Sequence, residues 1–144
     1  MIRPARREDI DALLAIQAAW PGLPRWTRGH FEEELTGASR CLLVWDEGGA
    51  VLGYGAVRWV APEAEIMAVA VFPERLRRGI GRGLLEALHA AAREDGCSIA
   101  GLEVSATNEA AQRLYASAGY DVVGRRAKYY NDLSDAVLMS RRLA

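Results

Sequence analysis

Glycines alternate with other residues at the junction of a predicted strand and a predicted helix, at Gly79, Gly81 and Gly83. The first N–H groups of a helix have no partner within the helix, and the helix dipole attracts anions to that end. Glycine has no Cβ to hold a phosphate away from this backbone. These features predict a phosphate-binding loop, although the glycines could also form no more than a tight turn. Arginines, which pair well with phosphate oxygens, form a basic cluster in and just before the same segment, at Arg75, Arg77, Arg78 and Arg82, and this cluster would suit a small polyanion.

The spacing of this loop excludes the best-known phosphate motifs. It lacks the G-x-x-x-x-G-K-(S/T) pattern of a P-loop, and it reads G-x-G-x-G rather than the G-x-G-x-x-G of dinucleotide folds. It also lies in the middle of the chain, after a predicted hairpin, whereas a dinucleotide fold places its loop after the first strand. A different phosphate-containing ligand is therefore expected.

A carboxylate stands in an apolar strand predicted over residues 98–104. Glu103 lies on the face of this strand opposite Leu102 and Val104, near its C-terminal end. Sites in α/β proteins gather at the carboxyl ends of strands, so Glu103 is a candidate general base. A solubility charge on an edge strand, or an ion pair with an arginine, would explain the same residue.

A phenol and an amide are placed to share one face of a predicted helix. Tyr115 follows Asn108 by seven residues, which is two helical turns, or about 10 Å along the axis. A phenol of pKa ~10 stays protonated at pH 7 and can donate to a thiolate of pKa ~8.5. Tyr115 is thus a candidate acid, and packing of its ring between helix and sheet is the alternative.

These residues need a framework of strands and helices to bring them together. The order of predicted elements is βααβββαβαββ, which indicates a mixed sheet with helices on both faces, of the α/β or α+β class. Periodicity and turn signals predict strands over residues 2–5, 41–45, 51–60, 65–72, 98–104, 120–127 and 135–143 and helices over 7–19, 27–37, 80–93 and 107–118.

The composition suits one globular domain over residues 1–144, because 51% of the residues are hydrophobic and 26% are charged. A net charge of −1 argues against binding to a nucleic-acid backbone, which requires a basic excess. The cysteines and histidines (Cys41, Cys97, His30 and His89) have no ligand spacing, so no metal is expected. The sequence has no signal segment and no run of about 18 apolar residues, so we expect a cytoplasmic protein that does not enter a membrane.

Three stretches of the sequence carry a resemblance to a known family: F-P-E-R-L-R-R-G-I-G-R-G-L-L, L-E-V-S-A-T-N-E-A-A-Q-R-L-Y-A-S-A-G-Y and R-R-A-K-Y-Y-N-D-L-S-D-A-V-L-M. With the element order, they resemble the GCN5-related N-acetyltransferase (GNAT) superfamily over essentially the whole chain. Within it, they are most similar to the bacterial ribosomal-protein alanine N-acetyltransferase type. The first stretch is similar to the acetyl-CoA pyrophosphate motif (Q/R)-x-x-G-x-(G/A), but Leu76 stands at the first motif position. We therefore expect backbone amides, with Arg77 or Arg78, to hold the pyrophosphate.

The resemblance implies a GNAT fold, acetyl-CoA as cosubstrate and a role for each matching residue. Glu103 would be the general base, acting directly or through a water, and Tyr115 the general acid. The backbone of residues 69–71 would pair with the pantetheine arm, and the loop over residues 77–82 would hold the pyrophosphate. The side-chain amide of Asn108 would form a hydrogen bond to the pantetheine. The implied cofactor-binding set is Val69, Ala70, Val71, Arg77, Arg78, Gly79, Ile80, Gly81, Arg82 and Asn108.

The acceptor is the least determined part of the reaction. No Ser-His-Asp or Cys-His arrangement is evident, so we expect an amine to attack the thioester directly. At pH 7 an α-amine of pKa ~8 is about 10% neutral and a lysine only ~0.04%, which favours a protein N-terminus. The resemblance implies the N-terminal alanine of a small-subunit ribosomal protein. Other N-termini, lysine, a small amine, or a non-catalytic acyl-CoA-binding module remain as alternatives.

Aromatic and acidic segments are candidates for contact with the acceptor. The loop from Trp20 to Trp26 and the Tyr129-Tyr130 hairpin would flank it in this fold, unless they pack as ordinary loops. The three consecutive glutamates at residues 32–34 could attract a basic acceptor peptide, or they could form a solvated helix face. The last predicted strand, over 135–143, could pair across a dimer, so we expect a monomer or weak dimer.

Overall fold

A computed structural model describes residues 1–20, 23, 25–76, 78–130 and 133–143. Within these residues the strands form one seven-stranded sheet in the order β1-β2-β3-β4-β5-β7-β6. The strands are β1 (Ile2–Pro4), β2 (Arg40–Glu47), β3 (Ala50–Val60), β4 (Glu63–Val71), β5 (Ile99–Ser105), β6 (Asp121–Arg126) and β7 (Ala136–Arg142). The helices are α1 (Ile10–Ala18), α2 (Arg28–Thr36), α3 (Ile80–Glu94) and α4 (Glu109–Ser117), with short 3-10 turns η1 (Arg7–Asp9) and η2 (Pro73–Arg75).

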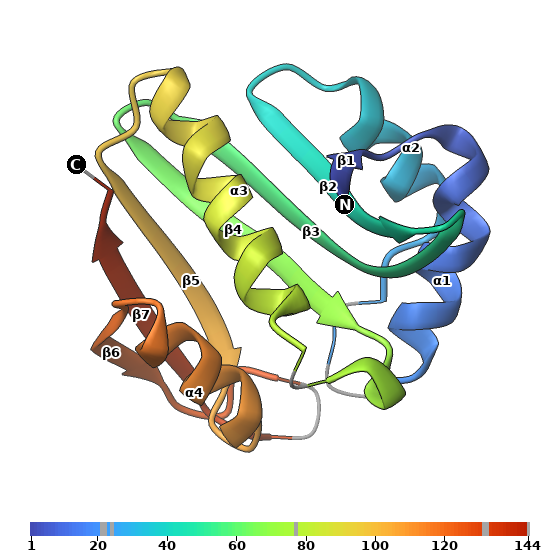
Figure 1. The fold of residues 1–144 in the computed structure, drawn as a ribbon. Coiled ribbons are helices and arrows are strands. Elements are labelled where there is room, and N and C mark those ends of the chain that lie inside the picture. The colour runs from blue at the N-terminus through green and yellow to red at the C-terminus, as the bar shows by residue number, and fades with distance from the viewer. Residues whose placement is uncertain (21–22, 24, 77, 131–132, 144) are drawn as a thin grey trace.

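The helices cover both faces of the sheet, as the element order predicted. Helix α3 crosses the face turned to the viewer in Figure 1, and α4 lies beside it over β5 and β7. One buried cluster, centred on Leu84, Leu85 and Leu88 of α3, fills the space between that helix and the sheet. A second cluster, around Ile10 and Phe31, lies between the other face and the pair α1 and α2. The predicted mixed α/β sheet is therefore confirmed.

Caps fix the start of α2 and both ends of α4. The Thr27 hydroxyl accepts the amide of His30 at 3.1 Å at the start of α2. Asn108 Oδ1 accepts the amide of Ala111 at 3.1 Å at the start of α4. Gly119, with φ of 94°, ends α4 in the left-handed conformation that favours glycine. Among the described residues, no helix is long and apolar enough to cross a membrane.

Strands β4 and β5 open into a fork. They are parallel neighbours, but Glu63–Glu65 pairs only with residues 99–101, and beyond this point the two strands continue without pairing with each other. The parting starts at a bulge, since Ala56 of β3 pairs with Ala68 and the next residue pairs with Ile66. Met67 is thus an extra residue on β4, and such a residue bends its strand away from a neighbour.

The bulge also exchanges the two faces of β4. Ile66 packs in the cluster beneath α3, whereas Ala68 and Ala70 pack in the opposite cluster, so Val69 and Val71 contact the α3 side. The Phe72 amide donates to β3, at Leu52 O, at 3.0 Å. Because backbone groups alternate between the two neighbours of a strand, the N–H and C=O groups of Val69 and Val71 point into the fork.

The position of the last strand differs from the prediction. Strand β7 was expected to be exposed and able to pair across a dimer, but it lies between β5 and β6 and pairs antiparallel with both. Both of its hydrogen-bonding edges are therefore used within the sheet. The edge strand on that side of the sheet is β6, because the chain returns after β6 to insert β7 between β5 and β6.

Candidate active site

A cleft of about 510 Å³ lies between the free part of β4, the start of α3 and one side of α4. Most of the predicted site residues meet here, although they come from three separate elements. Those that line the cleft are Val69, Ala70, Val71, Gly79, Ile80, Gly81, Arg82, Asn108 and Tyr115.

The start of α3 forms the polar end of this cleft. Gly79 adopts a left-handed conformation with φ of 78°, and its carbonyl accepts the amide of Gly83 at 2.9 Å. The amides of the three residues between them occupy the first turn, where a helix leaves N–H groups without internal partners. No acidic side chain stands in that turn. An anion is therefore the ligand that this helix end favours.

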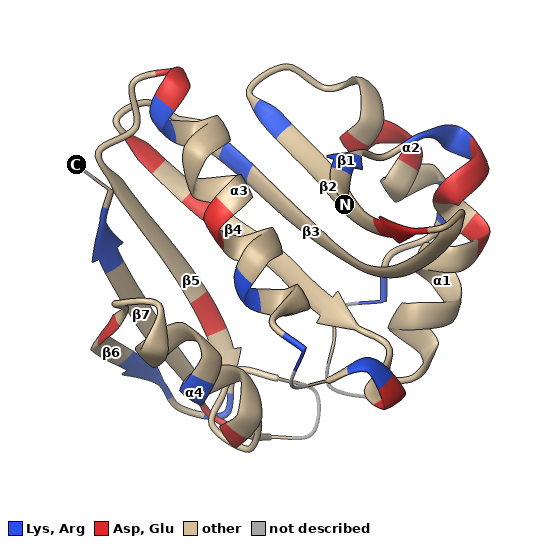
Figure 2. Ribbon diagram, in the orientation of Figure 1, with Lys and Arg blue, Asp and Glu red and all other residues tan. Residues whose placement is uncertain are grey.

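Basic residues gather around the same helix end, as Figure 2 shows. Arg82 lines the cleft, and so does Arg75, which belongs to the predicted basic cluster but not to the cofactor-binding set that the resemblance implied. Arg78 does not line it, because its guanidinium forms an ion pair with Glu47 at 3.2 Å. Arg77 lies outside the described residues. The positive charge at the cleft is therefore supplied partly by a residue other than those the motif indicated.

The three glycines of the loop have different roles. A Cβ at Gly81 would lie 3.4 Å from Leu114 of α4 and 3.9 Å from Val69, so it would occupy the cleft. A Cβ at Gly83 would lie 3.1 Å from the ring of Trp45 on β2. Gly83 thus permits close packing of α3 on the sheet, and the prediction that it opens the backbone to phosphate is wrong.

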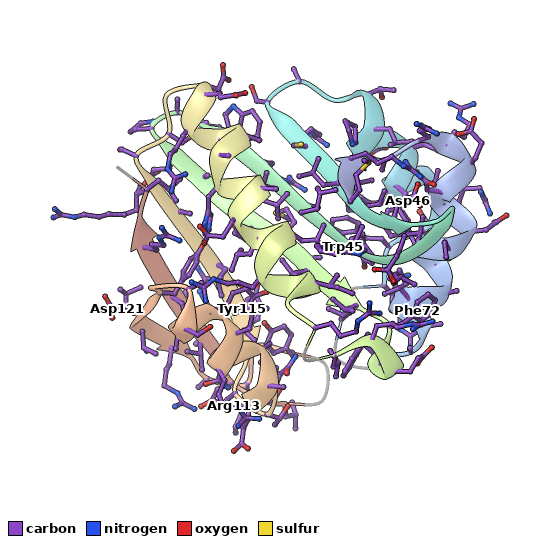
Figure 3. All side chains as sticks on the ribbon, in the orientation of Figure 1. Trp45, Asp46, Phe72, Arg113, Tyr115 and Asp121 are labelled. Atoms are coloured by element: carbon purple, nitrogen blue, oxygen red, sulfur yellow. The ribbon has the colours of Figure 1, made fainter. Side chains whose placement is uncertain are left out.

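Tyr115 lies on the side of α4 that faces the sheet (Figure 3). Its ring is buried, with 7% of its surface exposed, and it lines the cleft together with Asn108, two turns earlier. The predicted shared helix face is therefore confirmed. Burial raises the pKa of the Tyr115 phenol above its ordinary value, and the neighbouring phenol of Tyr130 adds to the rise. The phenol is protonated at neutral pH.

Glu103 lies on the other face of the sheet. Its neighbours Leu102 and Val104 are buried on the α3 side, and the carboxylate lines a depression of about 460 Å³ that also borders Glu65 at the fork. Arg126 Nη1 lies 3.7 Å from Glu103 Oε1. The Tyr129 hydroxyl donates a hydrogen bond to this carboxylate, which raises the pKa of Tyr129. The ion pair considered from the sequence is present, but Glu103 is still 27% exposed.

The base and acid candidates therefore do not share one pocket. Tyr115 approaches the fork from the α3 side and Glu103 approaches it from the opposite side. In a continuous sheet the backbone would separate them. Here β4 and β5 are unpaired beyond Gly101, so two groups on opposite faces can reach one reacting centre between the strands.

Similarity to known proteins identifies the family of this chain. The model of the acetyltransferase (GNAT) family matches residues 8–120. The chain belongs to the GNAT family. N-alpha-acetyltransferase RimI of Mycobacterium tuberculosis is 35% identical over 141 residues, which cover 94% of this chain and 87% of that protein.

Solved structures agree with this assignment. The ribosomal-protein-S18-alanine N-acetyltransferase from Escherichia coli superposes with a TM-score of 0.87 at 28% identity, over 100% of this chain and 94% of that one. The structure of yncA from Salmonella typhimurium with its cofactor acetyl-CoA gives a TM-score of 0.81 at 25% identity, over 100% and 94%. This GNAT protein is therefore an N-acetyltransferase, and its family uses acetyl-CoA.

The cleft fits an acyl-CoA donor on grounds of its own geometry. The unpaired helix amides and arginines suit a pyrophosphate, and the free edge of β4 offers backbone groups to an amide-containing arm. Gly81 leaves open a space that a Cβ would fill. Leu76, which replaces a polar motif residue, lines the cleft and is 45% exposed. In the described residues, no group of three or more metal-ligating side chains comes together.

The aromatic loop of this GNAT chain divides into two parts. The Trp20 indole donates to the Val71 carbonyl at 2.8 Å and lines the cleft, a contact that the sequence did not indicate. Trp26 is 7% exposed and stacks on His30, so its predicted contact with an acceptor is wrong. Pro21, Gly22 and Pro24 of this loop, and Asn131 and Asp132 of the second loop, lie outside the described residues.

The acidic run of α2 does not offer three free charges to an acceptor. Glu34 is buried, and its carboxylate lies 3.3 Å from Arg40 and 3.2 Å from His30. Glu32 forms an exposed pair with Arg7 at 3.5 Å. Glu34 therefore belongs to neither an acceptor-attracting patch nor a solvated helix face, because helix period turns this residue inward.

We expect Gly81→Ala to separate binding from folding. The new methyl group would enter the cleft and weaken acetyl-CoA binding about tenfold, or ~1.4 kcal/mol. It would not lower the melting temperature, because alanine is the better helix former and the nearest atom lies at an ordinary contact distance of 3.4 Å. Calorimetric titration and thermal unfolding measure the two effects.

Gly83→Ala is the matched control, because its methyl group meets Trp45 instead of the cleft. It should change the melting temperature and leave acetyl-CoA affinity unaltered. Equal affinity losses in both variants would contradict the distinction between these glycines.

Proposed function

We propose that this GNAT enzyme transfers an acetyl group from acetyl-CoA to the N-terminal α-amine of a protein, with the N-terminal alanine of a small-subunit ribosomal protein as acceptor. The observation that carries the proposal is the fork, with Glu103 on one face and Tyr115 on the other. Two relatives support the acceptor class through their names, an N-alpha-acetyltransferase and a ribosomal-protein-S18-alanine N-acetyltransferase.

In this proposal the cleft binds acetyl-CoA, which supplies an acetyl group activated as a thioester. The amides of residues 79–82 and the guanidinium of Arg82 hold the pyrophosphate, with Arg75 adding charge. The backbone groups of Val69 and the amide of Val71 pair with the pantetheine arm, while the Val71 carbonyl accepts the Trp20 indole. Asn108 has its Oδ1 engaged as helix cap, so its amide nitrogen is the group that would bond to the pantetheine.

Glu103 and Tyr115 manage the two protons of the transfer. Glu103 accepts a proton from the amine, directly or through a water, while the nitrogen bonds to the acetyl carbon. The carbon–sulfur bond then breaks, and Tyr115 gives its proton to the departing sulfur. The products are an amide and a thiol, and solvent exchange returns Glu103 and Tyr115 to their starting states. A positioned base and acid each typically contribute ~10²–10⁴ in rate.

The acceptor reaches the fork from the Glu103 side. The depression there is open, and Tyr129, 48% exposed and hydrogen-bonded to Glu103, borders the carboxylate. An α-amine of pKa ~8 gives up its proton to such a carboxylate more easily than a lysine of pKa ~10.4.

Mass spectrometry of a peptide panel tests the acceptor class. A peptide that begins with alanine, taken from a small-subunit ribosomal protein, should gain one acetyl group at its α-amine. The same peptide with a blocked N-terminus and an internal lysine is the control and should gain none. Acetylation of that lysine, or of small amines alone, would reject an N-terminal acceptor, and binding of acetyl-CoA without release of thiol across the panel would reject turnover.

A further inference from the structure

A second buried tyrosine supports the ring of Tyr115. Tyr120 follows α4, and the ring centroids of Tyr115 and Tyr120 lie 5.8 Å apart in an edge-to-face arrangement with an interplanar angle of 65°. The Tyr120 amide also donates to the Tyr115 carbonyl at 3.0 Å. Backbone and ring contacts therefore join the two residues, and Tyr120 is 3% exposed.

The hydroxyl of Tyr120 is tied to α3 through a histidine. Tyr120 OH and His89 Nε2 lie 2.6 Å apart, and the His89 side chain is fully buried. Burial, reinforced by the charge of Arg141, lowers the pKa of His89 to about 4. The imidazole is therefore neutral at pH 7 and carries a single proton on one of its two nitrogens.

The position of that proton follows from counting hydrogens on Arg141. Its Nη1 lies 2.9 Å from Glu86 Oε1, 2.9 Å from the Ala118 carbonyl and 3.2 Å from His89 Nδ1. A terminal guanidinium nitrogen has two hydrogens, and the two closest oxygens use both. His89 Nδ1, which lies 3.4 Å from Glu86 Oε1, then carries the imidazole proton. Nε2 is left to accept the proton of Tyr120.

We propose that Glu86, His89 and Tyr120 form a hydrogen-bonded relay that positions Tyr115, and that Tyr120 is a positioning residue for acetyl transfer. The inference rests on the proposed role of Tyr115 as acid. A phenol that donates to sulfur must keep its O–H direction while the carbon–sulfur bond breaks, and small displacements are costly in rate. The relay holds the Tyr120 ring at its hydroxyl, so the edge-to-face contact between the two rings restricts rotation of the Tyr115 ring.

Nothing in simple packing requires this arrangement. A phenylalanine at position 120 would fill the same volume without burying a hydroxyl beside the buried imidazole of His89. Buried polar groups are costly unless each is hydrogen-bonded, and here the Tyr120 hydroxyl and the His89 imidazole are hydrogen-bonded to each other.

The test is a double-variant cycle on turnover. Tyr120→Phe keeps the ring and should lower kcat on the order of tenfold, with an unchanged KM for acetyl-CoA, because the cleft lining is intact. If Tyr120 acts through Tyr115, the variant Tyr115→Phe/Tyr120→Phe should be no slower than Tyr115→Phe alone. Tyr54→Phe, which alters a buried phenol of the opposite cluster, should leave kcat unchanged.

Variants at position 89 distinguish the effect of the hydrogen bond to Tyr120 from the effect of the volume that the imidazole ring fills. His89→Leu should reproduce the kcat loss of Tyr120→Phe. His89→Gln, whose side-chain oxygen can accept the Tyr120 proton, should recover most of the turnover. Melting temperatures of all variants show whether a loss of turnover reflects unfolding, which lowers the active fraction.

Each failure has its own signature. Multiplicative losses in the double variant, or a Tyr120→Phe protein with wild-type kcat and only a lower melting temperature, would overturn the relay while leaving the acid role of Tyr115 intact. Wild-type turnover in Tyr115→Phe would overturn the proposed acid itself, and the relay with it.

Discussion

Glu103→Gln is expected to lower kcat by ~10²–10⁴, the contribution of a positioned general base. Glutamine keeps the size of the side chain and still accepts the hydrogen bond from Tyr129, but it cannot take a proton from the amine. The lost pair with Arg126 is solvent-exposed, and such pairs contribute little to stability. The melting temperature and the KM for acetyl-CoA should therefore stay close to those of the wild type. Steady-state kinetics with an α-amine acceptor measures this change.

Glu65→Gln is the matched control for that experiment. Glu65 borders the same depression and pairs with β5 at Gly101, at the base of the fork, but it is assigned no part in proton transfer. It should retain the wild-type kcat. If both substitutions reduced turnover equally, the effect would reflect the charge of the depression and not a base at position 103.

Tyr115→Phe is expected to lower kcat by a similar factor, ~10² or more, because the departing thiolate loses its proton donor. The ring remains, so the cleft keeps its shape and the KM for acetyl-CoA should change little. Burial raises the pKa of the phenol, and the same environment raises the pKa of a thiol buried beside it, so donor and acceptor stay matched. Single-turnover measurement of thiol release isolates the chemical step from product release.

The leaving group provides the control for this second prediction. A donor thioester with a more acidic thiol needs less help from an acid, so the loss caused by Tyr115→Phe should shrink with it. A loss of the same size for every leaving group would contradict acid catalysis. A rise in KM with an unchanged kcat would assign Tyr115 to binding alone.

The sequence by itself determined the elements and much of the cleft. Strand and helix order, the caps at Thr27 and Asn108 and the inward face of α3 follow from signals within a few residues of one another. The side of β5 on which Glu103 stands follows from simple alternation along the strand, because its neighbours are apolar. The loop at the start of α3 could be recognised for the same reason, since its glycines and arginines are contiguous.

Only the tertiary structure decided what joins those parts into a site. The extra residue Met67 becomes visible when β4 is paired with β3, and it opens the fork through which Glu103 and Tyr115 can serve one centre. The packing of Gly83 on Trp45, the placement of β7 between two strands and the contact of Tyr120 with His89 likewise join residues far apart in the chain. Local periodicity depends on neighbours along the backbone, whereas these contacts depend on which surfaces meet when the sheet assembles, and no short segment encodes that choice.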